Sequence, residues 1–324
     1  MTTLLTPAHG AVVPLMTDTQ KHFRQNSEMI SKEDKGWRAM AGNYETQSTY
    51  PLSLQFTWNS DAAADRFVLS QNPDLSSPIY TAECKNSIEI YNLCIATTYY
   101  WQVNGSEVRR FDTEDLAPRW IYADGAFNIR DIGGWKTTDG KRIRQGLLYR
   151  GTEMNTHVII KEEGIRVLRD MLGIKTDLDL RGEAQGLYTE SPLGKEVNYR
   201  LIPTKAYGDF FPDKATTKIL FDILSDQNSY PLYFHCWGGA DRTGTLALLT
   251  EALLGVSEDD LYLDFELTTL SDNPRTRHEE ICKDVMPAIR AYPGETLAKQ
   301  AENYLLNCGI TEKQIETIRT IFLT

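Results

Sequence analysis

The stretch that decides the fold runs from residue 230 to residue 254. It begins Tyr230-Pro231-Leu232-Tyr233-Phe234-His235-Cys236 and continues Trp237-Gly238-Gly239-Ala240-Asp241-Arg242-Thr243-Gly244. The first segment is a short apolar run, typical of a buried strand, and the second is a loop of small residues. From Thr245 to Leu254 leucines recur at helical spacing, and Gly255 is placed to end that helix. The sequence therefore predicts a strand, a tight loop and a helix, in that order.

The loop carries a cysteine and an arginine that are suited to bind and attack a phosphate. Five residues separate Cys236 from Arg242, enough for the chain to wrap around one phosphate group. Backbone N–H groups of such a loop and the following helix N-terminus bind anions and favour a thiolate, and a guanidinium can bind two phosphate oxygens. We predict that Cys236 is the nucleophile, that Arg242 is the phosphate clamp, and that Thr243 helps the sulfur to leave.

Two other interpretations of this loop are weaker. A structural cysteine before a glycine turn would leave Asp241 and Arg242 unexplained, and a Walker-type loop is excluded because no lysine precedes Thr243. No metal or other cofactor is expected, since Arg242 and the loop amides supply the positive charge. Besides the catalytic pair, we predict a substrate-binding role for loop residues Trp237, Gly238, Gly239, Ala240, Thr243 and Gly244.

The loop resembles that of the bacterial branch of the tyrosine phosphatase superfamily, which reads His-Cys-x-x-Gly-x-Asp-Arg-Thr-Gly. Two further motifs resemble the same branch, residues 127–134 with 146–151 (Phe-Asn-Ile-Arg-Asp-Ile-Gly-Gly and Gly-Leu-Leu-Tyr-Arg-Gly) and residues 175–181 (Lys-Thr-Asp-Leu-Asp-Leu-Arg). The resemblance covers residues 119–324. It implies an α/β catalytic domain with a mixed sheet flanked by helices, and phosphatase activity on phosphotyrosine proteins, with dual specificity or phosphoinositides as alternatives.

The proton donor to the leaving group has two candidates. Members of the family generally take an aspartate from a mobile loop, and Asp209 beside Gly208 fits that description. Asp241 is favoured, because a carboxylate inside a phosphate-binding loop opposes an anionic substrate unless it is protonated or paired.

Several other polar residues are expected to support the site without touching substrate. His235 is predicted to orient the loop through hydrogen bonds. Asn128, Arg130 and Asp131 are expected to form a structural polar network under the turn at Gly133-Gly134, with an approach to the active site as the alternative. Arg150 and Arg181 are expected to be buried partners of carboxylates. The basic cluster Arg275, Arg277 and His278 either borders the cleft or, the preferred interpretation, lies in a solvated loop.

The residue pattern of the N-terminal third differs from that of the rest of the chain. Residues 1–45 look irregular and polar, and residues 46–115 contain short alternating strands with an Asn104-Gly105 hairpin signal. Trp58, Leu93, Tyr99 and Val103 resemble the fibronectin type III pattern, which implies a small all-β sandwich with a tyrosine corner at Tyr99. A linker over 112–118 would join it to the catalytic domain. We expect the sandwich to bind a partner or to act as a spacer. Adhesion through the sandwich is an alternative main function of the protein.

Composition and net charge limit the classes of molecule that the chain is expected to bind. The chain has 324 residues and a net charge of -11, which disfavours binding to nucleic acid or to anionic membranes. No apolar stretch is long enough to span a bilayer, and no secretory signal is visible. The five cysteines are scattered, which indicates a reducing compartment. We therefore expect a cytoplasmic protein, with secretion through a removed signal as the alternative.

The residue at position 240 bears on the substrate class. Ala240 lacks the positive charge that a lysine would offer to inositol phosphates, and its presence therefore favours phosphotyrosine-like monophosphates as substrates. An inactive phosphatase fold that binds phosphorylated ligands is the other rival.

Overall fold

The computed structural model describes residues 2–33, 48–182, 185, 189–271, 275 and 277–324, and it divides into two compact units. The first unit comprises residues 1–17 and 51–119, and the second comprises residues 18–50 and 120–324. Both units are therefore built from segments that alternate along the chain. No helix in the described ranges combines the length and the apolar character needed to cross a membrane.

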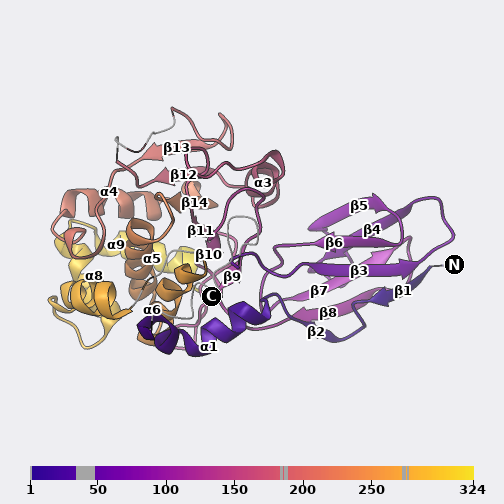
Figure 1. Ribbon diagram of the computed structural model, residues 1–324, viewed down its shortest axis with the longest axis horizontal. Helices are drawn as coiled ribbons and strands as arrows, with labels where there is room; N and C mark the ends of the chain where they lie inside the picture. Colours follow the sequence, from indigo (N-terminus) through magenta and orange to yellow (C-terminus); the bar gives the residue numbers. More distant parts are fainter. Residues whose placement is uncertain (1, 34–47, 183–184, 186–188, 272–274, 276) are drawn as a thin grey trace. The chain divides into compact units, whose positions relative to one another are not determined.

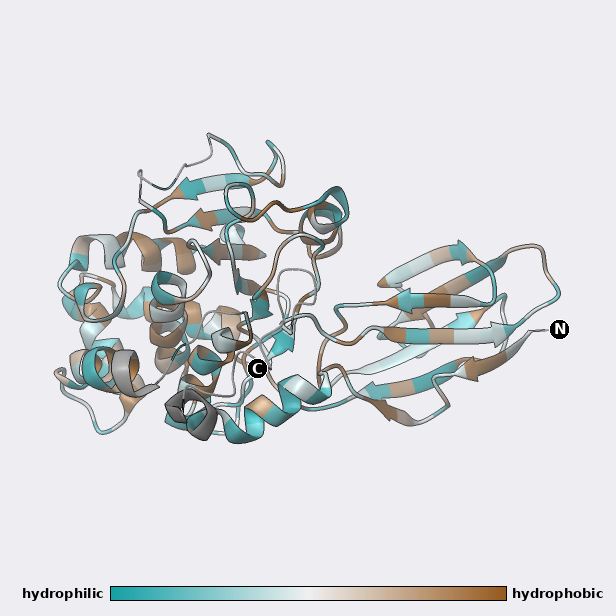
Figure 2. Ribbon diagram, viewed as in Figure 1, coloured by the Kyte–Doolittle hydropathy of each residue, from teal (hydrophilic) through white to brown (hydrophobic). Residues whose placement is uncertain are grey.

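The first unit consists of two β-sheets. One has the order β1-β3-β6, formed by Thr3–Thr6, Leu54–Asn59 and Ser87–Ile90. The other has the order β2-β8-β7-β4-β5, formed by Ala11–Val13, Arg109–Thr113, Thr98–Val103, Asp65–Ser70 and Tyr80–Cys84. Apolar and polar residues alternate along these strands (Figure 2), as a half-buried strand requires.

Aromatic side chains fill the space between the two sheets. Phe56 on β3 contacts Phe67, Trp101 and Phe111 on the other sheet edge to face, with ring centroids 4.9 to 5.7 Å apart. The Tyr99 hydroxyl accepts a hydrogen bond from the backbone N–H of Cys94 at 2.8 Å, the contact that the sequence predicted for this tyrosine.

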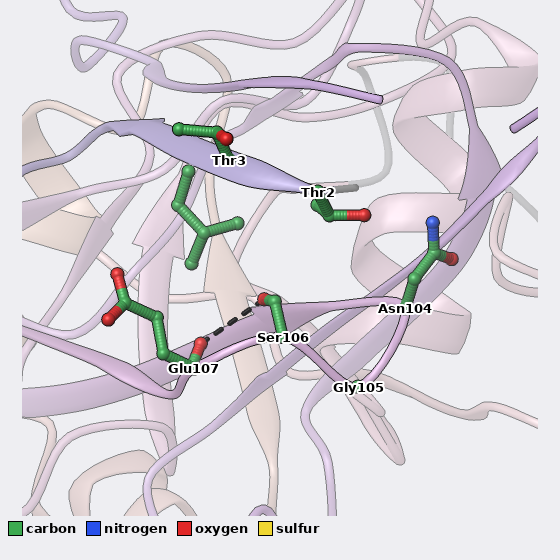
Figure 3. Close-up of a pocket in the computed structure, with 7 residues that line it drawn as sticks. Thr2, Thr3, Asn104, Gly105, Ser106 and Glu107 are labelled. Carbon is green, nitrogen blue, oxygen red and sulfur yellow. Dashed lines mark hydrogen bonds between the residues drawn. The ribbon is translucent and has the colours of Figure 1, made fainter. Parts of the chain in front are cut away.

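The first unit also contains a polar surface hollow of about 520 Å³ between β1 and the β7–β8 turn (Figure 3). Thr2 and Thr3 border it on one side, and Asn104 to Glu107 on the other. Its lining offers hydroxyl and amide groups with the single carboxylate of Glu107, so it has no pair of groups suited to nucleophilic or acid–base chemistry.

The expectation of an irregular lead-in over residues 1–45 was wrong for the part that is described. Residues 3–6 and 11–13 are strands of the first unit, and α1, Asp18–Glu33, is a helix of the second. The buried positions of α1 include Gln20 and Ser27 beside Phe23, so the helix has no continuous apolar stripe that periodicity could reveal. Residues 34–45 lie outside the described ranges.

The second unit is a six-stranded mixed sheet flanked by helices, which confirms the predicted α/β architecture (Figure 1). The strand order is β13-β12-β14-β11-β10-β9, formed by Asn198–Leu201, Thr176–Asp179, Leu232–His235, Leu148–Gly151, Arg130–Asp131 and Arg119–Trp120. The first four strands are parallel, and β10 runs antiparallel to β11.

Helices cover both faces of this sheet, as a parallel sheet requires. Figure 1 shows α3, Glu162–Arg166, on the side of the sheet opposite α4, α5, α8 and α9. Tyr149 and Tyr233 share a buried cluster with Val167 and Leu168 of η1, Val167–Met171, which continues α3. The other helical segments are η3 (Tyr207–Asp209), α4 (Lys214–Leu224), η4 (Gln227–Ser229), α5 (Asp241–Leu254), α6 (Glu258–Glu266), η5 (Leu267–Ser271), η6 (Arg277–Val285), α7 (Met286–Arg290), α8 (Leu297–Asn307) and α9 (Glu312–Phe322).

Candidate functional site

The predicted strand, loop and helix are β14, residues 236–240 and α5. Because β11, β12 and β14 are parallel and in register, Gly151, Asp179 and His235 lie side by side at their carboxyl ends. Loops at this edge of a parallel sheet are where ligands bind in open α/β folds. Cys236 follows directly and is 2% exposed.

The loop closes tightly against the end of β11 at one glycine. Gly239 has φ +66°, and a Cβ atom there would lie 2.4 Å from the Gly151 carbonyl oxygen. Both the dihedral angle and the close backbone contact require glycine at this position.

Two carbonyl groups of the loop are held by side chains from β11 and from the bend that precedes β10. Asn128 donates to the Gly238 carbonyl at 3.1 Å, and Arg150 donates to the Gly239 carbonyl at 2.9 Å. Asn128 itself is bonded through its side-chain oxygen to Arg130. The predicted supporting role of Asn128 and Arg130 therefore has a definite geometry, in which they lie behind the loop and fix its carbonyl groups.

The backbone N–H groups of the same loop are left without acceptors. Within the described part of the chain, the N–H groups of residues 237–240 donate to no protein atom. The hydroxyl group of Thr243, which is fully buried, also has no partner among the described residues. Together with the N-terminus of the 14-residue helix α5, this is the donor set of an anion-binding site.

A buried charge network supports the loop from behind. Asp264 binds Arg130 at 2.9 Å and Arg150 at 2.5 Å. Burial alone would raise the pKa of Asp264, but the two guanidinium groups lower it below its usual value. Burial lowers the pKa of Arg130 to about 10, so this arginine stays charged at neutral pH. Arg181 likewise pairs with Asp179 and Glu153, which confirms that Arg150 and Arg181 are partners of carboxylates.

His235, the residue before the nucleophile, is fully buried and bonded at both ring nitrogens. Its Nε2 is 3.0 Å from Asp177 Oδ1, and its Nδ1 is 3.2 Å from the Cys236 carbonyl oxygen. Burial would lower the pKa of His235, but Asp177 and Asp179 raise it above its usual value. These contacts fix the backbone at the start of the loop.

The Asp131 carboxylate stabilises a turn through hydrogen bonds to backbone N–H groups. Its two oxygens accept from the N–H groups of Gly133 and Gly146, each at 2.7 Å. Gly244 lies where α5 packs on Phe265, since a Cβ there would be 3.1 Å from that ring. Ala240 is buried as the residue preceding the first turn of α5.

Arg242 and Trp237 contact partners that the sequence did not predict. Arg242 donates to the side-chain oxygen of Gln185 at 2.6 Å. The indole of Trp237 stacks on the His157 ring, with centroids 4.1 Å apart and planes 5° apart. Neither Gln185 nor His157 belongs to a sequence motif that points to the loop.

The preferred interpretation of Arg275 as a residue of a solvated loop was wrong. Its side chain is 17% exposed and binds both carboxylate oxygens of Asp241, at 2.5 and 2.9 Å. The hydroxyl group of Tyr207 also donates to Asp241. The side chains of Arg277 and His278 lie outside the described part of the chain.

Asp209 ends the short η3 turn that Tyr207 begins. Tyr207 attaches this turn to α5 through its N–H group, 3.0 Å from Thr245 Oγ1, and through its hydroxyl group on Asp241. Asp209 is exposed and has no hydrogen-bond or ion-pair partner among the residues described. The turn that ends with Asp209 is thus attached to Asp241 through Tyr207.

Comparison with known proteins also identifies similarity to phosphatases. The family described as "Tyrosine phosphatase family" matches residues 121–324. A Cupriavidus necator protein that bears the provisional name of tyrosine-protein phosphatase is 27% identical over 169 residues, which are 44% of this chain and 60% of that relative. This chain thus spans about three fifths of the length of that relative. A crystal structure of the core catalytic domain of the PP-IP phosphatase SIW14 from S. cerevisiae, in complex with citrate, covers 55% of this chain and 90% of its own, with 14% identity and a TM-score of 0.33, a value that supports no conclusion.

Replacing Gly239 by alanine should disturb the loop more than the same change at a matched glycine. Gly173 has a similar φ of +68°, but a Cβ there would meet nothing within 4 Å. Both variants pay the cost of about 1 kcal/mol for a left-handed alanine, and only Gly239→Ala adds the overlap with the Gly151 carbonyl. Thermal unfolding should show a clearly larger loss of Tm for Gly239→Ala, and equal losses would contradict the described loop geometry.

Proposed function

The chain belongs to the tyrosine phosphatase family, and from this premise we propose that it hydrolyses phosphotyrosine in proteins through a cysteinyl-phosphate on Cys236. The observation that carries the proposal is the loop of residues 236–240, whose N–H groups at 237–240 have no acceptor within the described residues. Those groups and Arg242 would bind the three non-bridging oxygens of a phosphate. Cys236 lies at the start of the same loop, below the phosphorus atom.

In the first step, the thiolate of Cys236 attacks phosphorus in line with the bond to the tyrosine oxygen. An S–P bond forms, the P–O bond breaks, and the tyrosine oxygen leaves with a proton from an acid. The backbone N–H groups and Arg242 stabilise the charge on the transferring phosphoryl group. His235, held by Asp177, would keep the backbone of the nucleophile in place through its contact with the Cys236 carbonyl group.

In the second step, water attacks the phosphorus atom of the cysteinyl-phosphate. The O–P bond forms, the S–P bond breaks, and the acid group, now a carboxylate, takes the proton of the water. Thr243, whose buried hydroxyl lacks a partner among the described residues, would donate to the departing sulfur. Inorganic phosphate and the thiolate of Cys236 are regenerated, so the cycle balances.

We assign the acid to Asp241, with Asp209 as the alternative. Asp241 is the first residue of α5, directly after the loop, and its carboxylate pairs with Arg275. A phosphate dianion in the loop would compete with Asp241 for this guanidinium group. Asp209 has no such partner among the described residues, and it would act from the adjoining turn.

The first unit would serve as a fibronectin type III-like spacer or binding module. Its two sheets, the buried Trp58 and the hydrogen bond of Tyr99 support this interpretation. A phosphorylated protein in the cytoplasm would be the substrate, and the sandwich would offer a surface for a protein partner.

Changes at the two central residues should abolish turnover. A serine hydroxyl is hardly ionised at neutral pH, so Cys236→Ser should lower kcat by at least about a thousandfold. Arg242→Lys should also lose turnover, because an ammonium group cannot bind two phosphate oxygens in the bidentate way that a guanidinium group does. Hydrolysis of p-nitrophenyl phosphate and circular dichroism measure both variants, and activity of a folded Cys236→Ser protein would overturn the mechanism.

The two acid candidates can be distinguished by their dependence on the leaving group. Asp241→Asn should lower kcat on a phosphotyrosine peptide by roughly a hundred- to ten-thousandfold. With a phosphate ester of an acidic phenol, which needs no proton, the loss should be much smaller. Asp209→Asn is the matched control, and the reverse pattern between the two variants would transfer the assignment to Asp209. Near-normal rates of both variants on the peptide would exclude both residues.

The substrate class depends on the charge at position 240. Ala240 supplies no cation for a second phosphate, so kcat/KM should be higher for a phosphotyrosine peptide than for a soluble phosphatidylinositol bisphosphate. Ala240→Lys should shift the ratio toward the inositide, because charged hydrogen bonds to phosphate are strong. Since Ala240 is only 2% exposed, thermal unfolding must accompany the kinetics. Equal or better wild-type turnover of the inositide would contradict the proposed substrate class.

A further inference from the structure

A pocket of about 680 Å³ opens in the second unit, outside the catalytic loop. Its lining combines aromatic and aliphatic side chains with polar groups, and consists of Tyr50, Tyr122, Asp124, Gly125, Phe127, His157, Val158, Ile159 and Lys161. Tyr50 and Tyr122 meet edge to face, with ring centroids 4.9 Å apart. A concave surface with aromatic and aliphatic side chains beside a few polar groups is typical of a ligand site.

Two residues that line the pocket lie next to the catalytic loop. His157 lines the pocket, and its ring stacks on Trp237, the residue next to Cys236. Phe127 lines it as well and directly precedes Asn128, which binds the Gly238 carbonyl. A polypeptide whose phosphotyrosine occupies the loop would therefore have neighbouring residues within reach of the pocket.

The wall between pocket and loop is held in place by Glu153. Its carboxylate accepts from the N–H groups of Asn155, Thr156 and Val158 at 2.7 to 2.9 Å. Its own N–H group donates to the Trp237 carbonyl at 3.2 Å. Residues 155–158 are thus preorganised, which lowers the conformational cost of binding.

Charges at the pocket are already matched. Lys161 pairs with Asp124 at 3.0 Å, and His157 contacts Glu153 at 2.7 Å. Burial lowers the pKa of His157 against the opposing effect of Glu153, so the ring is mostly neutral at physiological pH. A second phosphate would find no uncompensated cation in these two pairs, whereas Ile159 presents an apolar side chain that is 60% exposed.

We propose that this pocket binds an aliphatic or aromatic side chain close to the phosphotyrosine in the same substrate polypeptide. The inference rests on the proposed function, because the phosphotyrosine must occupy the loop for the neighbouring side chain to reach the pocket. The pocket thereby adds sequence preference to a loop that by itself recognises only a phosphorylated side chain.

The test uses the full-length protein and a series of phosphotyrosine peptides in which one leucine moves from position −3 to position +3 in an otherwise alanine and serine background. Wild-type kcat/KM should rise about tenfold at one position or at two neighbouring positions, since burying a leucine side chain contributes about 1.5 kcal/mol or more. Ile159→Asn should remove most of that preference. Ile219→Asn on α4, a matched control at an isoleucine that is 43% exposed and does not line the pocket, should retain it.

p-Nitrophenyl phosphate separates this inference from the proposed function, because it fills the loop and has no neighbouring side chain. Its turnover should change less than twofold in Ile159→Asn. Turnover of p-nitrophenyl phosphate without any leucine preference in the wild type would overturn the pocket proposal alone. An equal loss on every substrate in Ile159→Asn would do the same, by making Ile159 part of the catalytic loop's support. Absence of turnover on all substrates would instead reject the proposed function.

Discussion

The ion pairs of Asp264 with Arg130 and Arg150 connect the sheet to the helical layer and determine the shape of the loop. Removing one partner of a buried ion pair leaves an uncompensated charge, which is far more costly than the pair is favourable. Here the two arginines also reach the loop, Arg150 directly at Gly239 and Arg130 through Asn128. The positions of the loop carbonyl groups, and hence of its N–H groups, depend on this one carboxylate.

The same network places two guanidinium groups around one carboxylate behind the loop. Burial and the neighbouring Asp264 raise the pKa of Glu251, a further buried carboxyl group of this network, well above its usual value. The 14-residue helix α5 begins at the end of the same loop, and a helix N-terminus favours an anionic ligand. The chain as a whole is acidic, with a net charge of -11, so the groups that favour an anion are gathered by the fold and not by the composition.

The parts of the site that could be predicted are those encoded locally. Strand, loop and helix follow one another over residues 230–254, so hydrophobic periodicity and the spacing of Cys236 and Arg242 were sufficient. Asp264 and Arg275 lie 134 and 34 residues from their partners Arg130 and Asp241, and no local pattern couples such distant charges. Helix α1 was missed for another reason, because two of its buried residues, Gln20 and Ser27, are polar and interrupt the apolar stripe. Gln20 is held by tertiary hydrogen bonds to the carbonyl groups of Ser48 and Tyr50.

The interleaving of the two units has a consequence for their inheritance. Strands β1 and β2 precede helix α1 in the chain, yet they complete sheets whose other strands lie after residue 50. Helix α1 is anchored in the second unit, where Gln20 donates to the carbonyl groups of Ser48 and Tyr50 at 2.9 Å. No single cut in the gene separates the two units, since any cut leaves one of them without a segment. A recombination event that moved only residues 121–324 would transfer the loop without α1, so the sandwich and the catalytic unit are expected to have been exchanged between genes together, as one linear cassette.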